Sequence, residues 1–237
     1  MNILPSNGGT LAHRRLLSVL ALITVTCCFA VAAIADENVA GQSSSGETRE
    51  PQTKKISLFD GRSLEGWVSV GSAEWRVEDG VLVGGQDGDP KRSGLIMTKK
   101  SFKDFELELE FKIDEHGKYN SGVYLRHDRK ARGRKGYQIN IGRAAAKEYT
   151  GLFLKDWLDK GDEHDKIRRP LEWNQLRIRA VGGHIECWLN GQKIVDYTDP
   201  DPKPELVKSG VIAFQTYGAE GHSGWVHFRK IRIEELK

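Results

Sequence analysis

Short segments in which apolar and polar residues alternate recur along the chain from Ile56 onward. The clearest segment is 105–113, where apolar side chains at every second position alternate with Glu106, Glu108, Glu110 and Lys112. A period of two predicts a β-strand with one buried face and one solvated face. The same pattern predicts strands at 123–127, 137–141, 176–181, 185–189, 211–217 and 226–233.

Turn signals separate these predicted strands. Asp79-Gly80 and Asn190-Gly191 each lie between two apolar runs, and such pairs adopt the positive φ angles that two-residue hairpins need. Helical periodicity is nearly absent: only 144–147 and 153–158 are candidates, and each is long enough for a turn or two. Many short strands joined by glycine-rich turns predict an all-β antiparallel sandwich of the jelly-roll kind.

The first 55 residues have a different character. His13, Arg14 and Arg15 precede a charge-free, mostly apolar run over 16–35, which ends on Ala-Ile-Ala, and this pattern is typical of a cleaved signal peptide. An uncleaved membrane anchor is the alternative, and lipidation at Cys27 or Cys28 is a weaker one. Residues 36–55 are rich in Ser, Gly and charge and predict a flexible linker. We therefore expect export to the periplasm or beyond, with the folded domain at 56–237.

Composition and charge exclude two classes of protein, a disordered chain and a nucleic-acid-binding protein. The chain is 38% hydrophobic and 29% charged and contains 26 Gly, so it is globular rather than disordered. Its net charge of +3 is too small for the electrostatic footprint of a nucleic-acid-binding protein. Cys187 is the only thiol after residue 35, and its place in a strand pattern predicts a small buried hydrophobe.

Alternation also sorts side chains by face. If the apolar residues of each strand point into the core, their neighbours point outward, and the outward set is Tyr124, Arg126, Gln138, Asn140, Glu186, Trp188 and Gln215. Aromatic rings among amides and a guanidinium suit a sugar, which has an apolar ring face and hydroxyls that need donors and acceptors. The sequence leaves two interpretations open: one carbohydrate-binding surface, or the solvated faces of strands in different sheets.

A set of segments in a fixed order resembles the 3-keto-disaccharide hydrolase domain family. The segments are LFDGRSLEGW from Leu58, WRVEDG from Trp75, DFELELEF from Asp104, NSGVYLR from Asn120, GYQINI from Gly136, EWNQLRIRAVG from Glu172, CWLNGQKIVDY from Cys187, GVIAFQTYG from Gly210 and FRKIRIEEL from Phe228. The resemblance implies a concanavalin A-like sandwich and hydrolysis of oxidised sugars. A carbohydrate would then be the partner.

One position departs from that family, because Gln138 stands where many members have an acidic residue. An amide forms hydrogen bonds with a substrate but does not take up a proton. The candidates for a catalytic base are therefore His127, Glu148 and His164, and Glu186 is a weaker candidate. Arg126 suits the stabilisation of an oxyanion. A non-catalytic carbohydrate-binding module on the same face is the main alternative, and a structural domain of laminin-G type is the third.

A cluster of acidic residues with one histidine lies at 159–165. Carboxylates and an imidazole hold divalent cations in many proteins, and Asp162 and Asp165 are the candidate ligands here. The cluster lacks the residue order of a calcium-binding loop, and nearby Lys and Arg residues fit a solvated charged loop instead. A divalent cation thus remains a possible cofactor, and the sequence indicates no other.

Overall fold

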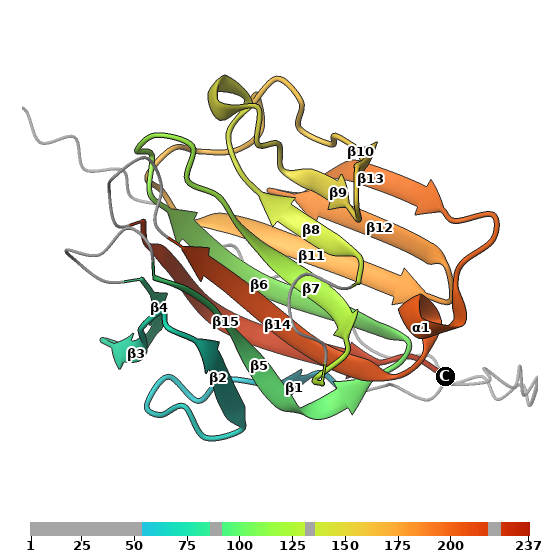
Figure 1. The fold of residues 1–237 in the computed structure, drawn as a ribbon, viewed down its shortest axis with the longest axis horizontal. Coiled ribbons are helices and arrows are strands. Elements are labelled where there is room, and N and C mark those ends of the chain that lie inside the picture. The colour runs from blue at the N-terminus through green and yellow to red at the C-terminus, as the bar shows by residue number, and fades with distance from the viewer. Residues whose placement is uncertain (1–53, 86–91, 131–135, 218–223) are drawn as a thin grey trace, which may run out of the picture. The chain divides into compact units, whose positions relative to one another are not determined.

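Two antiparallel sheets pack face to face in the computed structural model, which describes residues 54–85, 92–130, 136–217 and 224–237 (Figure 1). Sheet A runs in the order β13 (Gln192–Thr198), β12 (His184–Leu189), β11 (Asn174–Val181), β6 (Phe105–Ile113), β15 (Val226–Glu235), β4 (Val81–Gly84) and β3 (Trp75–Glu78), with β1 (Ile56–Ser57) beside β15. Sheet B runs in the order β10 (Trp157–Asp159), β9 (Gly151–Phe153), β8 (Gln138–Ile141), β7 (Ser121–His127), β14 (Gly210–Tyr217), β5 (Ser93–Phe102) and β2 (Trp67–Gly71).

The core lies between the two sheets and is built from the apolar positions of the alternating segments. Phe214 of sheet B stacks on Phe228 of sheet A with ring centroids 4.4 Å apart, and Trp67 packs against Phe214 at 5.3 Å. These side chains belong to one continuous buried cluster that draws on both sheets. The prediction of an antiparallel β-sandwich is therefore confirmed.

The turn predictions agree with the structure at both hairpins. Asp79-Gly80 joins β3 to β4 with φ of 49° and 80°, and Asn190-Gly191 joins β12 to β13 with φ of 49° and 84°. Residues at 144–147 form the short 3-10 turn η1 (Ala144–Ala146). The helical expectation for 153–158 is wrong, because this segment is the tight β9–β10 hairpin, in which Phe153 pairs with Trp157. A single turn of α-helix, α1 (Pro204–Val207), precedes β14.

Cys187 is fully buried and free, as predicted, and its burial raises the pKa of the thiol. The predicted signal peptide at 1–35 and nearly all of the predicted linker at 36–55 lie outside the described residues. Within the described part of the chain, no helix is long and apolar enough to cross a membrane.

Candidate functional site

A row of paired residues crosses the outer face of sheet B. The strand registers place Ala213 opposite Tyr124, Tyr124 opposite Gln138, Gln138 opposite Phe153, and Phe153 opposite Trp157. Residues that pair directly in an antiparallel sheet point to the same side. Four strands, β7 to β10, therefore contribute a phenol, an amide and two aromatic rings to one surface, which continues onto β14.

A second row runs beside the first and contains two glycines. Gln215 pairs with Gly122, Gly122 with Asn140, and Asn140 with Gly151. A Cβ atom at Gly122 would lie 2.0 Å from Nε2 of Gln138, so the Gln138 side chain lies directly over this glycine. The missing side chain lets Gln138 reach across β7 toward β14.

Hydrogen bonds hold these polar side chains in one arrangement. The Tyr124 hydroxyl and Gln138 Nε2 both donate to Gln215 Oε1, at 3.1 and 3.0 Å, and Asn140 Nδ2 donates to the Tyr149 carbonyl at 2.8 Å. Gln215 Oε1 thus accepts two bonds, and the same amide carries Nε2 as a donor group, while Asn140 carries Oδ1 as an acceptor group. These four side chains are buried, with exposed fractions of 1% for Tyr124, 2% for Gln138, 4% for Asn140 and 5% for Gln215.

His127 joins the same face through an irregularity in β7. Ala213 pairs with Tyr124 and Val211 pairs with His127, so two residues of β7 oppose a single residue of β14. This β-bulge lets His127 point to the same side as Tyr124, three positions earlier, and their rings lie 5.4 Å apart. We call Tyr124, His127, Gln138, Asn140 and Gln215 the amide centre.

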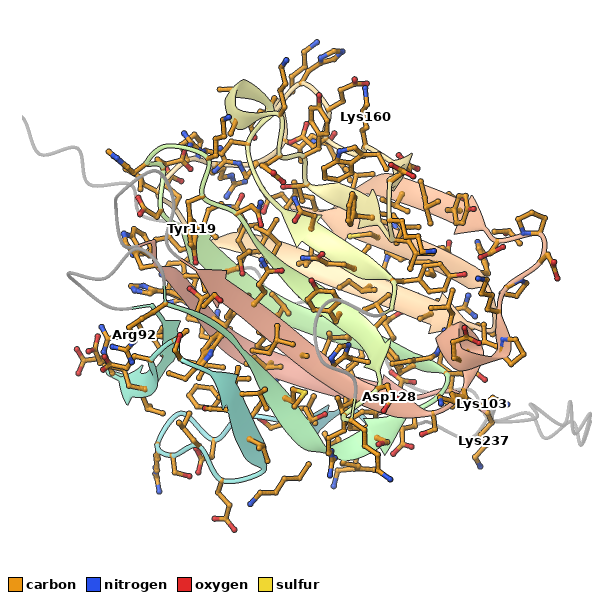
Figure 2. All side chains as sticks on the ribbon, viewed as in Figure 1. Arg92, Lys103, Tyr119, Asp128, Lys160 and Lys237 are labelled. Carbon is orange, nitrogen blue, oxygen red and sulfur yellow. The ribbon has the colours of Figure 1, made fainter. Side chains whose placement is uncertain are left out.

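Arg126 does not share this face, which corrects the expectation from strand alternation. It has a φ of 54° in the bulge, and its side chain turns to the end of the sandwich, where it is 1% exposed. Its guanidinium donates to the carbonyls of Lys103, Gly182 and Leu206 and pairs with Asp104 at 3.2 Å. Figure 2 shows Lys103 and Asp128 together at this end of the molecule. The position fits a structural clamp and not an oxyanion contact in the amide centre.

Glu186 and Trp188 also lie elsewhere, because β12 belongs to sheet A. Their side chains occupy the outer face of that sheet, on the far side of the core from the amide centre. Hydrogen bonds from Lys193 and Arg179 lower the pKa of the Glu186 carboxyl against the effect of burial. A carboxylate held by two cations in this way is a poor base, so Glu186 is removed from the candidates.

Trp188 borders a groove of about 530 Å³ on sheet A but is not an open platform for a sugar. The Arg177 guanidinium lies 3.6 Å from the centroid of its ring, and Lys193 Nζ lies 5.0 Å from it. These two cations come from the strands on either side of β12. The ring is thus engaged in cation–π contacts that stabilise the outer face of the sheet.

Three aromatic side chains form the other end of the sheet B surface, and strand alternation did not identify them. Trp157 contacts Tyr149 and Phe153 edge to face, with ring centroids 5.0 and 5.2 Å away. All three are half-buried. We call Tyr149, Phe153 and Trp157 the aromatic end. Asn140 links it to the amide centre through the Tyr149 carbonyl.

Similarity to known sequence families identifies the domain. The 3-keto-alpha-glucoside-1,2-lyase-like domain family matches residues 54–234, which is nearly the whole folded region. The chain belongs to this family. It is also 26% identical over 229 residues to the 3-keto-disaccharide hydrolase of Bacteroides thetaiotaomicron, a match that covers 76% of this chain and 78% of that protein.

Solved structures agree with the fold of a 3-keto-glucoside lyase-like domain. A candidate glycosyl hydrolase from Parabacteroides distasonis is 28% identical, with a TM-score of 0.58 over 77% of this chain and 100% of that chain. A Bacillus subtilis protein with a galectin-like fold has a TM-score of 0.57 at 12% identity over 77% and 94% of the two chains, which shows the shared sandwich alone. Family and relatives together support a glycoside-hydrolase-like or carbohydrate-binding function.

The remaining base candidates of this lyase-like domain lie near the face or on a loop. Glu148 directly precedes Tyr149, and its main chain packs against Gly142, where a Cβ would lie 2.1 Å from the Glu148 carbonyl oxygen. His164 is exposed on the loop after β10, beside Glu163. The His127 ring lies 5.4 Å from the Tyr124 ring, so His127 is the base candidate that we place on this face.

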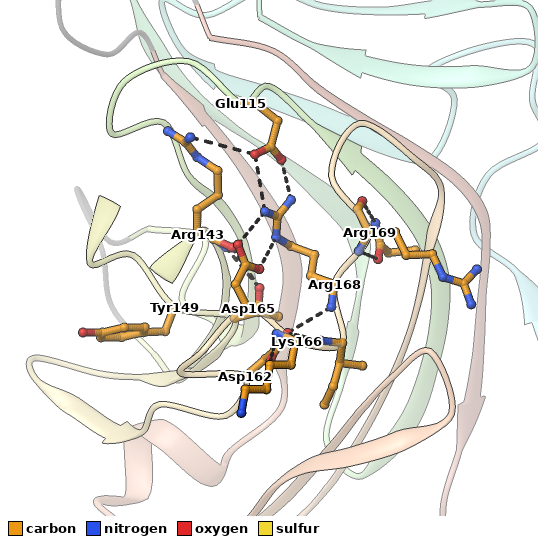
Figure 3. Close-up of polar contacts among 12 residues, drawn as sticks. Glu115, Arg143, Tyr149, Asp162, Asp165, Lys166, Arg168 and Arg169 are labelled. Carbon is orange, nitrogen blue, oxygen red and sulfur yellow. Dashed lines mark hydrogen bonds and ion pairs between the residues drawn. The ribbon is translucent and has the colours of Figure 1, made fainter. Parts of the chain in front are cut away.

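The candidate metal ligands Asp162 and Asp165 hold the loop after β10 through contacts within the protein (Figure 3). The Asp162 carboxylate accepts hydrogen bonds from the backbone N–H groups of Lys166, Ile167 and Arg168 at 2.8, 3.0 and 2.9 Å. Asp165 pairs with the buried Arg168 at 2.7 Å, and Arg168 also pairs with Glu115. This arrangement uses both carboxylates to fix the loop and favours the charged-loop interpretation.

Another group of potential metal ligands occurs in the described part of the chain, on sheet A. Ligand atoms of His184, Glu186 and Asp196 lie within 4.8 Å of one another. However, Lys193 Nζ lies 2.7 Å from Glu186 and 2.9 Å from Asp196, so an ammonium group already bridges these two carboxylates. The amide centre lies on the other sheet, so this group has no part in it.

We expect Asp162→Ala to lower the free energy of unfolding by about 1–3 kcal/mol, because three backbone donors, of which that of Arg168 is buried, lose their acceptor. Asp162→Asn keeps one carbonyl oxygen and should lose less. Urea unfolding measures both variants, and calcium or manganese should not change the wild-type midpoint. Equal stability of all three proteins, or a clear rise of the wild-type midpoint with metal, would contradict the structural assignment of Asp162.

Proposed function

We propose that the chain is an exported enzyme that cleaves 3-keto disaccharides or related oxidised glycosides on the outer face of sheet B. The observation that carries this proposal is the amide centre, where an imidazole and a phenol lie among three amides on one surface. Membership of the 3-keto-glucoside lyase-like family supports the same chemistry. The relative that is named a 3-keto-disaccharide hydrolase supports the substrate class.

The chemistry follows from the ketone. Ordinary glycosidases use two carboxyl groups that flank the bond, whereas a ketone at C3 acidifies the C–H bond at C2. A base removes that proton, the electron pair forms a C1–C2 double bond, and the C1–O bond breaks with its electrons on the leaving oxygen. A proton then goes to the leaving oxygen, and water adds across the double bond. This route needs one base, donors for the enolate oxygen and an acid.

The amide centre supplies the base and a donor for the enolate oxygen, and protonated His127 then returns its proton to the leaving oxygen. His127 is the base in this proposal, because a neutral imidazole accepts a proton and Gln138 does not. The amide N–H of Gln215, held by Tyr124 and Gln138, is a donor for the developing oxyanion. Asn140 Oδ1 accepts a hydrogen bond from a sugar hydroxyl. Fixed dipoles of this kind require little reorganisation during the reaction.

A non-catalytic carbohydrate-binding module is the second candidate function. The observation that favours it is Gln138: its amide forms a hydrogen-bonded cluster with Tyr124 and Gln215 in which the described partners include no carboxylate. Such a cluster binds hydroxyls without any proton transfer.

Sugar release from 3-keto disaccharides by the purified domain, with the unoxidised parent sugars as controls, separates these two functions. The enzyme proposal predicts release from the keto substrates only. Saturable binding of both sugar series without any release would establish the binding module and exclude the enzyme. Chelator and added divalent cations in parallel reactions report any metal requirement.

We also propose that export removes residues 1–35. N-terminal sequencing of the protein recovered from fractionated cells should begin at Asp36, in the periplasmic or extracellular fraction. A full-length chain in the membrane fraction would instead support an uncleaved anchor and contradict the cleavage.

A further inference from the structure

The aromatic end of the sheet B surface lies one step along the row from the amide centre. Phe153 pairs directly with Gln138, and Trp157 pairs with Phe153 on the next strand. Adjacent strands are about 4.8 Å apart, so the two rings lie one and two strand spacings from Gln138. Figure 1 shows β9 and β10 beside β8 at this edge of the sheet.

We propose that the aromatic end is a subsite for the second ring of the substrate, the one that departs after cleavage. This inference rests on the proposed function and adds to it the class of leaving group. The oxidised ring would lie over the amide centre, and a leaving group with a flat apolar face would lie over Trp157. Suitable leaving groups are a pyranose and an aryl alcohol, whereas a methyl group leaves the aromatic end unfilled.

The physical basis is the difference between the two halves of the surface. The amide centre offers donors and acceptors, which match the hydroxyls and ketone of the oxidised ring. The aromatic end offers half-buried rings, which are suited to the C–H face of a sugar or to another aromatic ring. Since Asn140 bonds the Tyr149 carbonyl, the aromatic end is fixed relative to the amide centre before substrate binds.

The hairpin geometry supports a formed subsite. The Trp157 ring contacts the Tyr149 ring and the Phe153 ring, and the interplanar angle is 68° in both pairs. Lys160 Nζ lies 5.2 Å from the Tyr149 ring, which adds a cation to the outer side of the cluster. Figure 2 labels this lysine at the rim of the molecule. A braced ring loses little conformational freedom when a ligand stacks on it.

The test compares three 3-keto glucosides that differ only in the leaving group: glucose, a phenol and methanol. Because the three leaving groups differ in acidity, each effect is measured as the ratio of variant to wild type on the same compound, and the loss of one stacking contact of about 1.4 kcal/mol is about a tenfold change. Trp157→Ala should lower kcat/KM for the glucose and phenol compounds about tenfold and leave the methyl compound within twofold. Trp157→Leu keeps apolar volume without a flat ring and should behave like the alanine variant, while Trp157→Phe should retain most of the activity.

Several outcomes decide the inference. An equal loss on all three substrates for Trp157→Ala and Trp157→Leu, or no loss on any of them, overturns it. Trp188→Ala, on the outer face of sheet A, is the matched control and should leave all three values unchanged. If the wild type cleaves none of the compounds, the proposed function fails. Calorimetry with the same compounds then tests the aromatic end alone: selective loss of ring-bearing ligands in Trp157→Leu supports it, and unchanged affinities overturn it.

Discussion

Arg126→Leu is expected to lower the free energy of unfolding by about 3–5 kcal/mol, the usual result of removing one partner from a buried charged network. The Arg126 side chain is buried and bonds three backbone carbonyls as well as Asp104. Leucine fills part of the volume and satisfies none of these acceptors. Because a domain of this size has only about 5–15 kcal/mol of stability, urea unfolding should show a large shift of the midpoint.

The control for this prediction is Arg179→Leu on the outer face of sheet A. Arg179 forms an ion pair with Glu186 at 3.1 Å, but its side chain is 39% exposed. Exposed ion pairs contribute about 1 kcal/mol or less, so this variant should unfold close to the wild type. A loss below about 1 kcal/mol in Arg126→Leu, comparable to that of the Arg179 variant, would show that Arg126 is not the clamp that the contacts indicate.

Gly122→Ala is expected to reduce kcat/KM on a 3-keto disaccharide about a hundredfold, the size of effect that a displacement of about 1 Å has in an active site. The new methyl group would lie 2.0 Å from Nε2, 2.8 Å from Cδ and 2.9 Å from Cγ of Gln138. The whole side chain must move, and its hydrogen bond to Gln215 breaks. The stability cost should stay near about 1–3 kcal/mol, as for other overpacked sites.

A double-mutant cycle with Gln138→Ala tests whether the clash with Gln138 causes the loss of activity in Gly122→Ala. All three nearest atoms to the new methyl group belong to Gln138, so removing that side chain removes the clash. Gly122→Ala should therefore cost almost no further activity or stability in the Gln138→Ala background. If the two substitutions instead have additive effects, the role assigned to Gly122 is refuted.

Alternation within single strands predicted much of this fold and part of the site. Segment 105–113 is strand β6, and the outward positions Tyr124, Gln138, Asn140 and Gln215 do share one face. These assignments depend on side-chain periodicity along one strand, which is a local property of the sequence. The predicted shared face was correct because β7, β8 and β14 are neighbours in sheet B.

Three features of the site depend on information that is not local. Strand membership placed Glu186 and Trp188 on sheet A, although their alternation looks the same as that of β8. The bulge in β7 turned Arg126 to the end of the sandwich and brought His127 onto the face. The register of β8, β9 and β10 set Trp157 in line with Gln138. Strand pairing and register arise from contacts across the whole fold, so periodicity in one segment does not reveal them.

We propose that catalysis occurs at the amide centre on sheet B. The most direct test compares two identical substitutions on opposite sheets, His127→Gln and His184→Gln, by kcat/KM on a 3-keto disaccharide. Loss of a general base costs about 10²–10⁴-fold, so His127→Gln should lose at least a hundredfold while it remains folded. His184 pairs with Asp196 on sheet A, and its variant should stay within twofold of the wild type. Full activity of His127→Gln, or an equal loss in both variants, would exclude His127 as the base of this reaction.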